Sequence, residues 1–409
     1  MMPGKKRIRL FIDAHCFDQE YQGSRTFLEG IYRSLIRNPD IHFFFGVSGV
    51  QQLSRIFGEA DNITYLEYRS RSGPVRLAWE IPRMISRHGI DVAHFQYILP
   101  LIRNCRQIAT IHDVIFREDP RSFSRGYRLL KNFLYKRSAH MADHITTVSA
   151  HSKQSIIDHL GVDSEKITVV PNAVDRRFFA DYDLPAAREF IREKFGIGKF
   201  ILCVSRFEPR KNQLLLVEAC LRLGLFQQGY HLVLPGHTSL ETPELDRLLE
   251  RLDPATRKLI FIDSHISNED LLQFYRAAEV FVYPSQAEGF GIPPLEAAAA
   301  CVPVICSDRS AMKDFTFFGA GHLDPLVPGL LDARLGEVLA AGRDPGELRS
   351  IANIVKKKYD WDISAGIFQT LISNHSTVNN DQFSKVRGKQ ERLETELPVG
   401  EAVFTPGDR

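Results

Sequence analysis

The chain has 409 residues, which is more than one ordinary domain holds and suits two. Its composition is that of a globular protein, with 44% hydrophobic and 25% charged residues. The formal net charge is only +2, so no global positive field favours binding to nucleic acid, and we expect no nucleic-acid partner.

The first half of the chain alternates short β-rich runs with amphipathic helical stretches. Apolar strands alternating with helices predict a parallel sheet that is covered on both faces. We expect strands at residues 7–13, 41–46, 91–95, 107–112, 144–148 and 167–170, and helices at residues 25–37 and 149–160.

A second alternating series follows the turn-rich residues 171–184 and a helix at 186–195. Its strands are predicted at residues 200–204, 231–234, 259–262, 280–283 and 304–306, and its helices at residues 212–223, 243–252, 268–278 and 293–300. The fold class is therefore α/β, with two doubly wound Rossmann-like domains that face a cleft where a ligand binds.

These patterns also predict the limits of the domains. We expect an N-terminal domain at residues 1–190, a C-terminal domain at 191–360, a final helix at 361–374 that packs back towards the N-terminal domain, and a disordered tail at 375–409.

The most informative segment is EGFGIPPLE, residues 288–296, which follows the apolar strand predicted at 280–283. Pro293 suits the first turn of a helix, and the glycines before it let a ligand approach the backbone closely. Free N–H groups at such a helix start suit phosphates, and the carboxylates of Glu288 and Glu296 can accept hydrogen bonds from sugar hydroxyls.

A second segment, FILCVSRFEPRKNQLLL, places two cations between a strand end and a helix start. Arg206 and Lys211 in this position form a natural clamp for a diphosphate. Taken alone, the pair would be read as ordinary surface residues; the acidic motif downstream changes that interpretation.

EGFGIPPLE resembles the E-x7-E motif of the retaining GT-B glycosyltransferases of the family 4 type, and the resemblance extends over roughly residues 7–374. It implies that Arg206 and Lys211 stabilise the departing diphosphate, that Glu288 binds hydroxyls of the donor sugar, and that Glu296 binds the ribose. It also implies donor binding by Phe290, Gly291 and Ile292 at the helix start. By the same resemblance, the domain at residues 1–190 is expected to be the acceptor domain and the domain at residues 191–360 the nucleotide-sugar donor domain.

The N-terminal half adds further matches to this family. YQGSRT, residues 21–26, resembles its glycine loop, in which Gly23 would meet the donor phosphate. IHD, residues 111–113, resembles the family's HD at a strand end, which implies that His112 contacts the donor sugar near the reacting carbon. VSAHS and PNAVD resemble signatures that are mainly structural, and Asn172 is interpreted as a turn residue.

The resemblance implies a hexosyltransferase that takes a sugar from a nucleotide diphosphate, with GDP-mannose favoured, and passes it to a glycan or lipid-linked acceptor in polysaccharide assembly. Two alternatives stay open: a degenerate protein that binds nucleotide sugars without turnover, and another GT-B-fold enzyme such as a nucleotide-sugar epimerase. A glycan phosphorylase would need a pyridoxal-phosphate lysine site, which we do not identify.

No metal ion or cofactor is expected. Asp360-Trp361-Asp362 has the form of a DxD metal motif, but it adjoins the final helix, where a structural role is favoured. The six cysteines form no CxxC pair, which suits reduced thiols and a cytoplasmic protein. No stretch approaches the apolar length of a membrane span. The basic and aromatic residues 117–137 suggest peripheral contact with an anionic membrane at its inner face.

Overall fold

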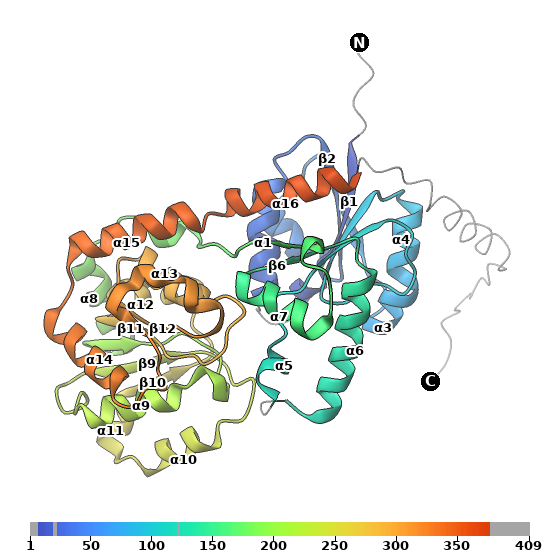
Figure 1. The fold of residues 1–409 in the computed structure, drawn as a ribbon. Helices are drawn as coiled ribbons and strands as arrows, with labels where there is room; N and C mark the ends of the chain where they lie inside the picture. Colours follow the sequence, from blue (N-terminus) through green and yellow to red (C-terminus); the bar gives the residue numbers. More distant parts are fainter. Residues whose placement is uncertain (1–6, 19–22, 121–122, 377–409) are drawn as a thin grey trace, which may run out of the picture. The chain divides into compact units, whose positions relative to one another are not determined.

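The computed structural model describes residues 7–18, 23–120 and 123–376. It contains two parallel β-sheets with helices between most successive strands, so the predicted doubly wound α/β fold is confirmed (Figure 1). Tyr21 and Gln22 of the predicted glycine loop lie outside the described residues, as does the predicted tail beyond residue 376.

The first sheet has seven strands in the order β3-β2-β1-β4-β5-β6-β7. Strand β1 pairs with β2 on one side and with β4 on the other, so the chain changes direction across the sheet between β1 and β4. The strands are β1 (Ile8–Asp13), β2 (Ile41–Val47), β3 (Ile63–Glu67), β4 (Val92–Gln96), β5 (Arg106–Thr110), β6 (His144–Thr147) and β7 (Ile167–Val169). Strand β3 was not predicted, because residues 63–67 carry no continuous apolar run. In the structure these residues are at most partly buried.

The second sheet has six strands in the order β10-β9-β8-β11-β12-β13, and here the change of direction falls between β8 and β11. Its strands are β8 (Phe200–Leu202), β9 (His231–Pro235), β10 (Ile260–Asp263), β11 (Val280–Tyr283), β12 (Val304–Ser307) and β13 (His322–Leu323). Buried aliphatic residues of these strands pack against α9 (Gln213–Arg222), α10 (Pro243–Arg251) and α14 (Leu330–Ala341) in one continuous core.

The helices begin and end where local chemistry favours it. The Asp183 side chain accepts a hydrogen bond from the Ala186 amide at the start of α8 (Leu184–Phe195), and Gly196 ends that helix in the left-handed conformation. The remaining helical segments are η1 (His15–Asp18), α1 (Gly23–Leu35), α2 (Val50–Phe57), α3 (Gly73–Val75), η2 (Arg76–Glu80), α4 (Ile81–Arg87), α5 (Ile115–Glu118), α6 (Arg125–Met141), α7 (Ala150–Leu160), η4 (Ser164–Lys166), η5 (Arg176–Phe179), η6 (Pro209–Lys211), α11 (Pro254–Lys258), α12 (Asn268–Ala277), α13 (Ile292–Ala299), η7 (Ser310–Asp314), η8 (Thr316–Gly321), α15 (Pro345–Lys358) and α16 (Trp361–Ser376).

The contacts within the chain divide it into two compact units. Unit 1 holds the described residues up to 110, residues 141–144 and the described residues from 368 onward; unit 2 holds residues 111–140 and 145–367. In unit 1 the Phe368 ring of α16 lies 4.6 Å from the imidazole of His94 and 6.2 Å from the Tyr32 ring. The last turns of α16 therefore belong to the core of unit 1.

Candidate functional site

The loop after β8 and the loop after β11 meet at the carboxyl edge of the second sheet. Strands β8 and β11 are neighbours, and the chain runs to opposite sides of the sheet from them. Such a topological switch point leaves a crevice at the carboxyl ends of the strands, which is where open α/β sheets bind ligands. The two predicted site segments therefore come together by the topology of unit 2.

A buried carboxylate, Glu288, is the centre of this site. Its Oε1 atom accepts hydrogen bonds from Ser285 Oγ at 2.6 Å, from Tyr283 Oη at 3.0 Å and from Lys211 Nζ at 2.5 Å. Its Oε2 atom lies 3.2 Å from Arg210 Nη1. The sequence prediction joined Lys211 and Glu288 only through a family motif, whereas the structure joins them by a direct ion pair.

These neighbours determine the charge of the cluster. Burial would raise the pKa of Glu288, but Lys211 and Arg210 lower it to about 2. Burial lowers the pKa of Lys211, and Glu288 opposes that change. Burial also disfavours the charged form of Arg210, yet Glu288 and Glu208 raise its pKa above the ordinary range. The group is thus a buried set of ionised partners in a low-dielectric environment, where electrostatic interactions are strong.

The structure adds Arg210 and Glu208 to the predicted pair of cations. Arg210 Nη2 lies 2.7 Å from Glu208 Oε2, and Arg206 Nη2 lies 3.2 Å from Glu208 Oε1. The Arg206 side chain is 44% exposed, whereas that of Arg210 is only 6% exposed. Charges of alternating sign therefore lead from the surface at Arg206 to the buried Glu288. The signal for Arg210 was its position in EPRK beside Lys211, but the sequence did not indicate which cation points inwards.

The start of α13 has the geometry that its sequence predicted. Gly291 precedes the helix with φ of 106°, in the left-handed region that favours glycine, and proline lies in the first turn. Phe290 is buried, with its ring centroid 5.7 Å from that of Tyr359. Ile292 is the first residue of the helix, so its backbone N–H group is among those that have no partner within the helix.

Glu296 lies one turn into α13, away from the Glu288 cluster. Its Oε2 atom accepts a hydrogen bond of 2.7 Å from Tyr275 Oη. Burial raises the pKa of Glu296 to about 7, and the hydrogen bond from Tyr275 only partly offsets this effect. The two carboxylates of the motif therefore differ in chemistry, since Glu288 is firmly ionised and Glu296 titrates near neutrality.

The segment that follows β5 touches the same loop. A Cβ atom on Gly289 would lie 2.9 Å from Asp113 Cβ and 3.2 Å from the carbonyl oxygen of His112. Burial lowers the pKa of His112 to about 3, so its imidazole is neutral at physiological pH. The structure therefore brings the predicted His112 and the loop at 288–291 together within unit 2.

The VSAHS segment holds this loop from another side. Ser149 caps α7 by accepting a hydrogen bond from the Ser152 amide at 3.0 Å. Ser149 Oγ and Ser152 Oγ also donate to the carbonyl oxygen of Gly289, at 2.7 and 3.0 Å. The predicted structural role of this segment thus extends to fixing the backbone of the site loop.

The remaining predicted site residue lies in unit 1. Gly23 is the first residue of α1 and is exposed, with no atom within 4 Å of the position that a Cβ would take. The backbone at Gly23 is accordingly open to a ligand, but no contact within the described structure assigns one.

Two other features lie outside this site. Asp360 accepts a hydrogen bond from the Asp362 amide, and Asp362 pairs with Arg176 at 2.7 Å, so both carboxylates have structural partners. Among the described residues, no group of three or more His, Cys, Asp and Glu side chains is arranged to hold a metal ion.

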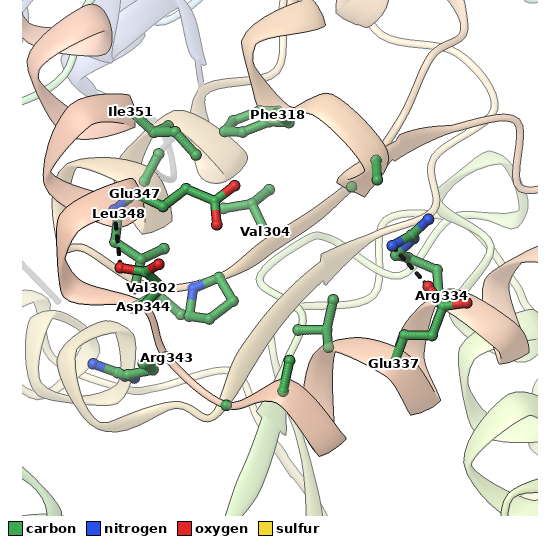
Figure 2. Close-up of a pocket in the computed structure, with 17 residues that line it drawn as sticks. Val302, Val304, Phe318, Arg334, Glu337, Arg343, Asp344, Glu347, Leu348 and Ile351 are labelled. Carbon is green, nitrogen blue, oxygen red and sulfur yellow. Dashed lines mark hydrogen bonds and ion pairs between the residues drawn. The ribbon is translucent and has the colours of Figure 1, made fainter.

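A cavity of about 470 Å³ lies at the opposite edge of the second sheet, beside Val304 where β12 begins. Figure 2 shows Arg334 and Glu337 on one of its walls, paired at 2.7 Å, and Asp344 and Glu347 on another. None of the predicted site residues lines it. It is therefore separate from the loops at the carboxyl edge.

Comparison with known proteins finds similarity to glycosyltransferases. The family "Glycosyl transferases group 1" matches residues 187–316, and "Glycosyltransferase Family 4" matches residues 27–178. The two halves of the chain are thus similar to two glycosyltransferase models, each over less than half of its length. The glycosyltransferase match at 187–316 includes the loops of Lys211 and Glu288, and the match at 27–178 includes His112.

Individual relatives agree with this assignment. The chain is 31% identical over 249 residues to O-antigen chain mannosyltransferase RfbU of Salmonella typhimurium, which covers 60% of this chain and 65% of that protein. A glycosyltransferase of Rickettsia africae has a TM-score of 0.70 at 18% identity over 92% of this chain and 100% of its own. Anabaena HepE in complex with UDP has a TM-score of 0.67 at 16% identity, over 90% of this chain and 100% of its own. The fold is thus GT-B.

The chain spans slightly less than two thirds of the length of RfbU. Within the described part of the chain, no helix is long and apolar enough to cross a membrane.

Proposed function

We propose that the protein is a retaining hexosyltransferase that moves a sugar, mannose favoured, from a nucleoside diphosphate to a hydroxyl of a glycan or lipid-linked acceptor. The observation that carries the proposal is the buried cluster of Lys211, Arg210 and Glu288 at the switch point of the second sheet, beside the start of α13. A related mannosyltransferase and a related structure in complex with UDP agree with a nucleotide-sugar donor.

The chemistry follows from the charge of the leaving group. Negative charge builds on the β-phosphate as the anomeric bond breaks, and preorganised cations and helix N–H groups stabilise such charge without reorganising. Lys211, Arg206 and the amides at Gly291 and Ile292 are the groups proposed for this role. Since they can supply the required positive charge, we propose that transfer needs no metal ion.

The two carboxylates have separate proposed roles. Glu288 keeps Lys211 and Arg210 in place and offers its Oε2 side to hydroxyls of the donor sugar. Glu296, which is held by Tyr275, binds the ribose hydroxyls. Neutral His112 donates or accepts one hydrogen bond at the sugar, and the departing phosphate takes the proton of the acceptor, which is consistent with retention.

The first test is a thermal-shift panel of GDP-mannose, UDP-glucose and UDP-GlcNAc with their free diphosphates, with and without EDTA. A selective shift that EDTA leaves unchanged is expected. Lys211→Ala and Glu288→Ala are expected to abolish the release of nucleoside diphosphate while the protein stays folded. Wild-type turnover in both variants would refute the enzymatic assignment, and binding without turnover over a broad acceptor panel would favour a degenerate binding protein.

We also propose peripheral contact with the cytoplasmic face of an anionic membrane through residues 117–137. Helix α6 exposes Leu129 (73%), Leu130 (59%) and Phe133 (66%), which is unusual for side chains of this size. The same helix carries basic side chains, namely Arg125, Arg128, Lys131, Lys136 and Arg137. Apolar side chains beside basic ones suit the interface of an anionic bilayer.

Co-sedimentation with vesicles that contain phosphatidylglycerol, at low salt, tests this contact. Wild-type protein is expected to sediment, and the double variant Leu129→Ser, Phe133→Ser to remain in solution. Phe190→Ser in α8 is the matched control, because Phe190 is also exposed but lies outside this segment. If the wild-type protein stays in solution, the contact does not exist.

A further inference from the structure

The segment after β12 packs against the site loop, residues 288–291, and holds the backbone of its first residue. Ser310 is the first residue of η7, and its Oγ atom accepts a hydrogen bond of 2.8 Å from the backbone amide of Glu288. The next amide, that of Ala311, donates to the carbonyl oxygen of Glu288 at 3.4 Å. Two consecutive residues of η7 therefore bind both backbone polar groups of Glu288.

Ser310 has a backbone conformation that serine rarely adopts. Its φ is 52°, in the left-handed region, where a Cβ atom is unfavourable and glycine or asparagine is usual. Asn212, which follows Lys211, has φ of 60° but is of a residue type that tolerates this region. The turn at Ser310 by itself would favour glycine, so the hydroxyl group is what serine adds at this position. Strained residues of this kind cluster at functional sites.

Buried side chains keep this turn in place. Met312 is completely buried, and its carbonyl oxygen lies 2.9 Å from Nε2 of His322 at the start of β13. A Cβ atom on Gly291 would lie 3.0 Å from Met312 Cγ and 3.2 Å from a ring carbon of Phe315. The segment η7 thus packs between β13 and the start of α13, and this packing determines where the Ser310 hydroxyl lies.

The contacts of η7 and of the VSAHS segment together fix three successive peptide groups of the site loop. The Ser310 hydroxyl binds the N–H group of Glu288, and the Ala311 amide binds its carbonyl oxygen. The two hydroxyls of VSAHS bind the carbonyl oxygen of Gly289. All of these groups belong to unit 2. Rotation of the first of these peptide groups would turn the Cα–Cβ bond of Glu288 and move its carboxylate away from Lys211.

We propose that Ser310 is a positioning residue for sugar transfer: its hydroxyl holds the backbone of Glu288 so that the carboxylate stays directed at Lys211 and Arg210. This inference rests on the proposed function, in which these charged groups meet the donor. Ser310 acts through Glu288 and does not itself touch the donor. The chemical step is sensitive to a misplacement of about 1 Å, so loss of the hydroxyl lowers kcat more than it weakens donor binding.

Two substitutions separate the hydroxyl of Ser310 from the shape of the turn. Ser310→Gly removes the hydroxyl but suits φ of 52°, so we expect a Tm close to that of the wild-type protein. Ser310→Thr keeps the hydroxyl but places a branched Cβ in a conformation that such residues avoid, so we expect a lower Tm. The positioning role predicts the opposite order for turnover.

Turnover is measured as release of GDP from GDP-mannose by the whole protein. Ser310→Gly is expected to lower kcat about tenfold, through loss of one hydrogen bond, with little change in KM for GDP-mannose. Ser310→Thr is expected to keep most of the wild-type kcat. Ser307→Ala is the matched control, because the buried Ser307 hydroxyl accepts a hydrogen bond of 3.2 Å from the Arg309 amide and not from the site loop.

Amide hydrogen exchange, followed by mass spectrometry at single-residue resolution, reports on the contact without any ligand. The Glu288 amide is expected to exchange faster in Ser310→Gly than in the wild-type protein, and at the wild-type rate in Ser307→Ala. Because this readout needs no turnover, it separates the role of Ser310 from the proposed function.

Wild-type kcat in Ser310→Gly would overturn the proposal, and so would an equal loss of kcat in Ser307→Ala. A folded Ser310→Thr that is as slow as Ser310→Gly would also overturn it; if Ser310→Thr does not fold, Ser310→Gly against Ser307→Ala decides. If the wild-type protein releases no GDP, the proposed function fails in this form. Exchange at Glu288 then decides whether Ser310 holds the site loop, and an unchanged rate in Ser310→Gly refutes that role.

Discussion

Replacing Glu288 with glutamine tests the electrostatic description of the site. The substitution keeps the shape of the side chain but removes the charge that faces Lys211 and Arg210, whose side chains are 8% and 6% exposed. Removing one partner of a buried ion pair costs about 3–5 kcal/mol. The lowering of the Glu288 pKa from 4.5 to about 2 gives a second value for this loss of stability, about 3 kcal/mol, at about 1.36 kcal/mol per unit of pKa.

The effect has a definite dependence on pH. A carboxyl with a lowered pKa in the folded state stabilises that state above its unfolded pKa and loses the contribution as the pH falls towards the folded value. The deficit of Glu288→Gln should therefore be full at pH 7, begin to shrink near pH 4.5, and be only about 1 kcal/mol at pH 3.

Tryptophan fluorescence during urea unfolding can measure the free energy of unfolding of unit 2 at each pH. The chain has two tryptophans, and a Trp79→Phe background leaves Trp361, which belongs to unit 2. Glu347→Gln is the control, because Glu347 is exposed and has no ion pair with any residue in the described part of the chain. A deficit under 1 kcal/mol at pH 7, or one as large at pH 3 as at pH 7, would refute the reasoning.

Three further changes should have measurable effects. Glu296→Gln should stabilise the protein above pH 7, because burial raises the pKa of Glu296 to about 7, and the gain should vanish below pH 4.5; a Tm difference constant with pH would contradict this. Gly289→Ala, which places a methyl group 2.9 Å from Asp113 Cβ, should cost about 1–3 kcal/mol and lower turnover; an unchanged Tm argues against the close contact. Ser149→Ala should lower stability by about 1–2 kcal/mol in urea unfolding, through loss of a helix cap and of a hydrogen bond to Gly289. Ser350→Ala, at an exposed serine of α15, is its control, and equal stability of these two serine variants would contradict the role of Ser149.

Much of the fold could be predicted because its elements have strong local signals. The helix of α8 has an Asp cap, a proline in its first turn and a terminal Gly196, and buried strands such as β11 read as continuous apolar runs. Strand β3 lacked such a signal, since its residues are only partly buried and its place is decided by pairing with β2. The expected domain limits at 190 and 360 stay predictions.

The sequence by itself determined the two doubly wound sheets, the glycine-rich start of α13 and the residue types of the donor loop, because periodicity, proline and glycine act locally. Only the tertiary structure decided which groups share the site. Arg210, rather than the exposed Arg206, reaches Glu288, and Ser310 meets Glu288 across 22 positions of sequence. Such contacts depend on how parallel strands are ordered and on where each backbone turns at the sheet edge. A small change in the path of the loop would decide which basic side chain is buried and which is exposed.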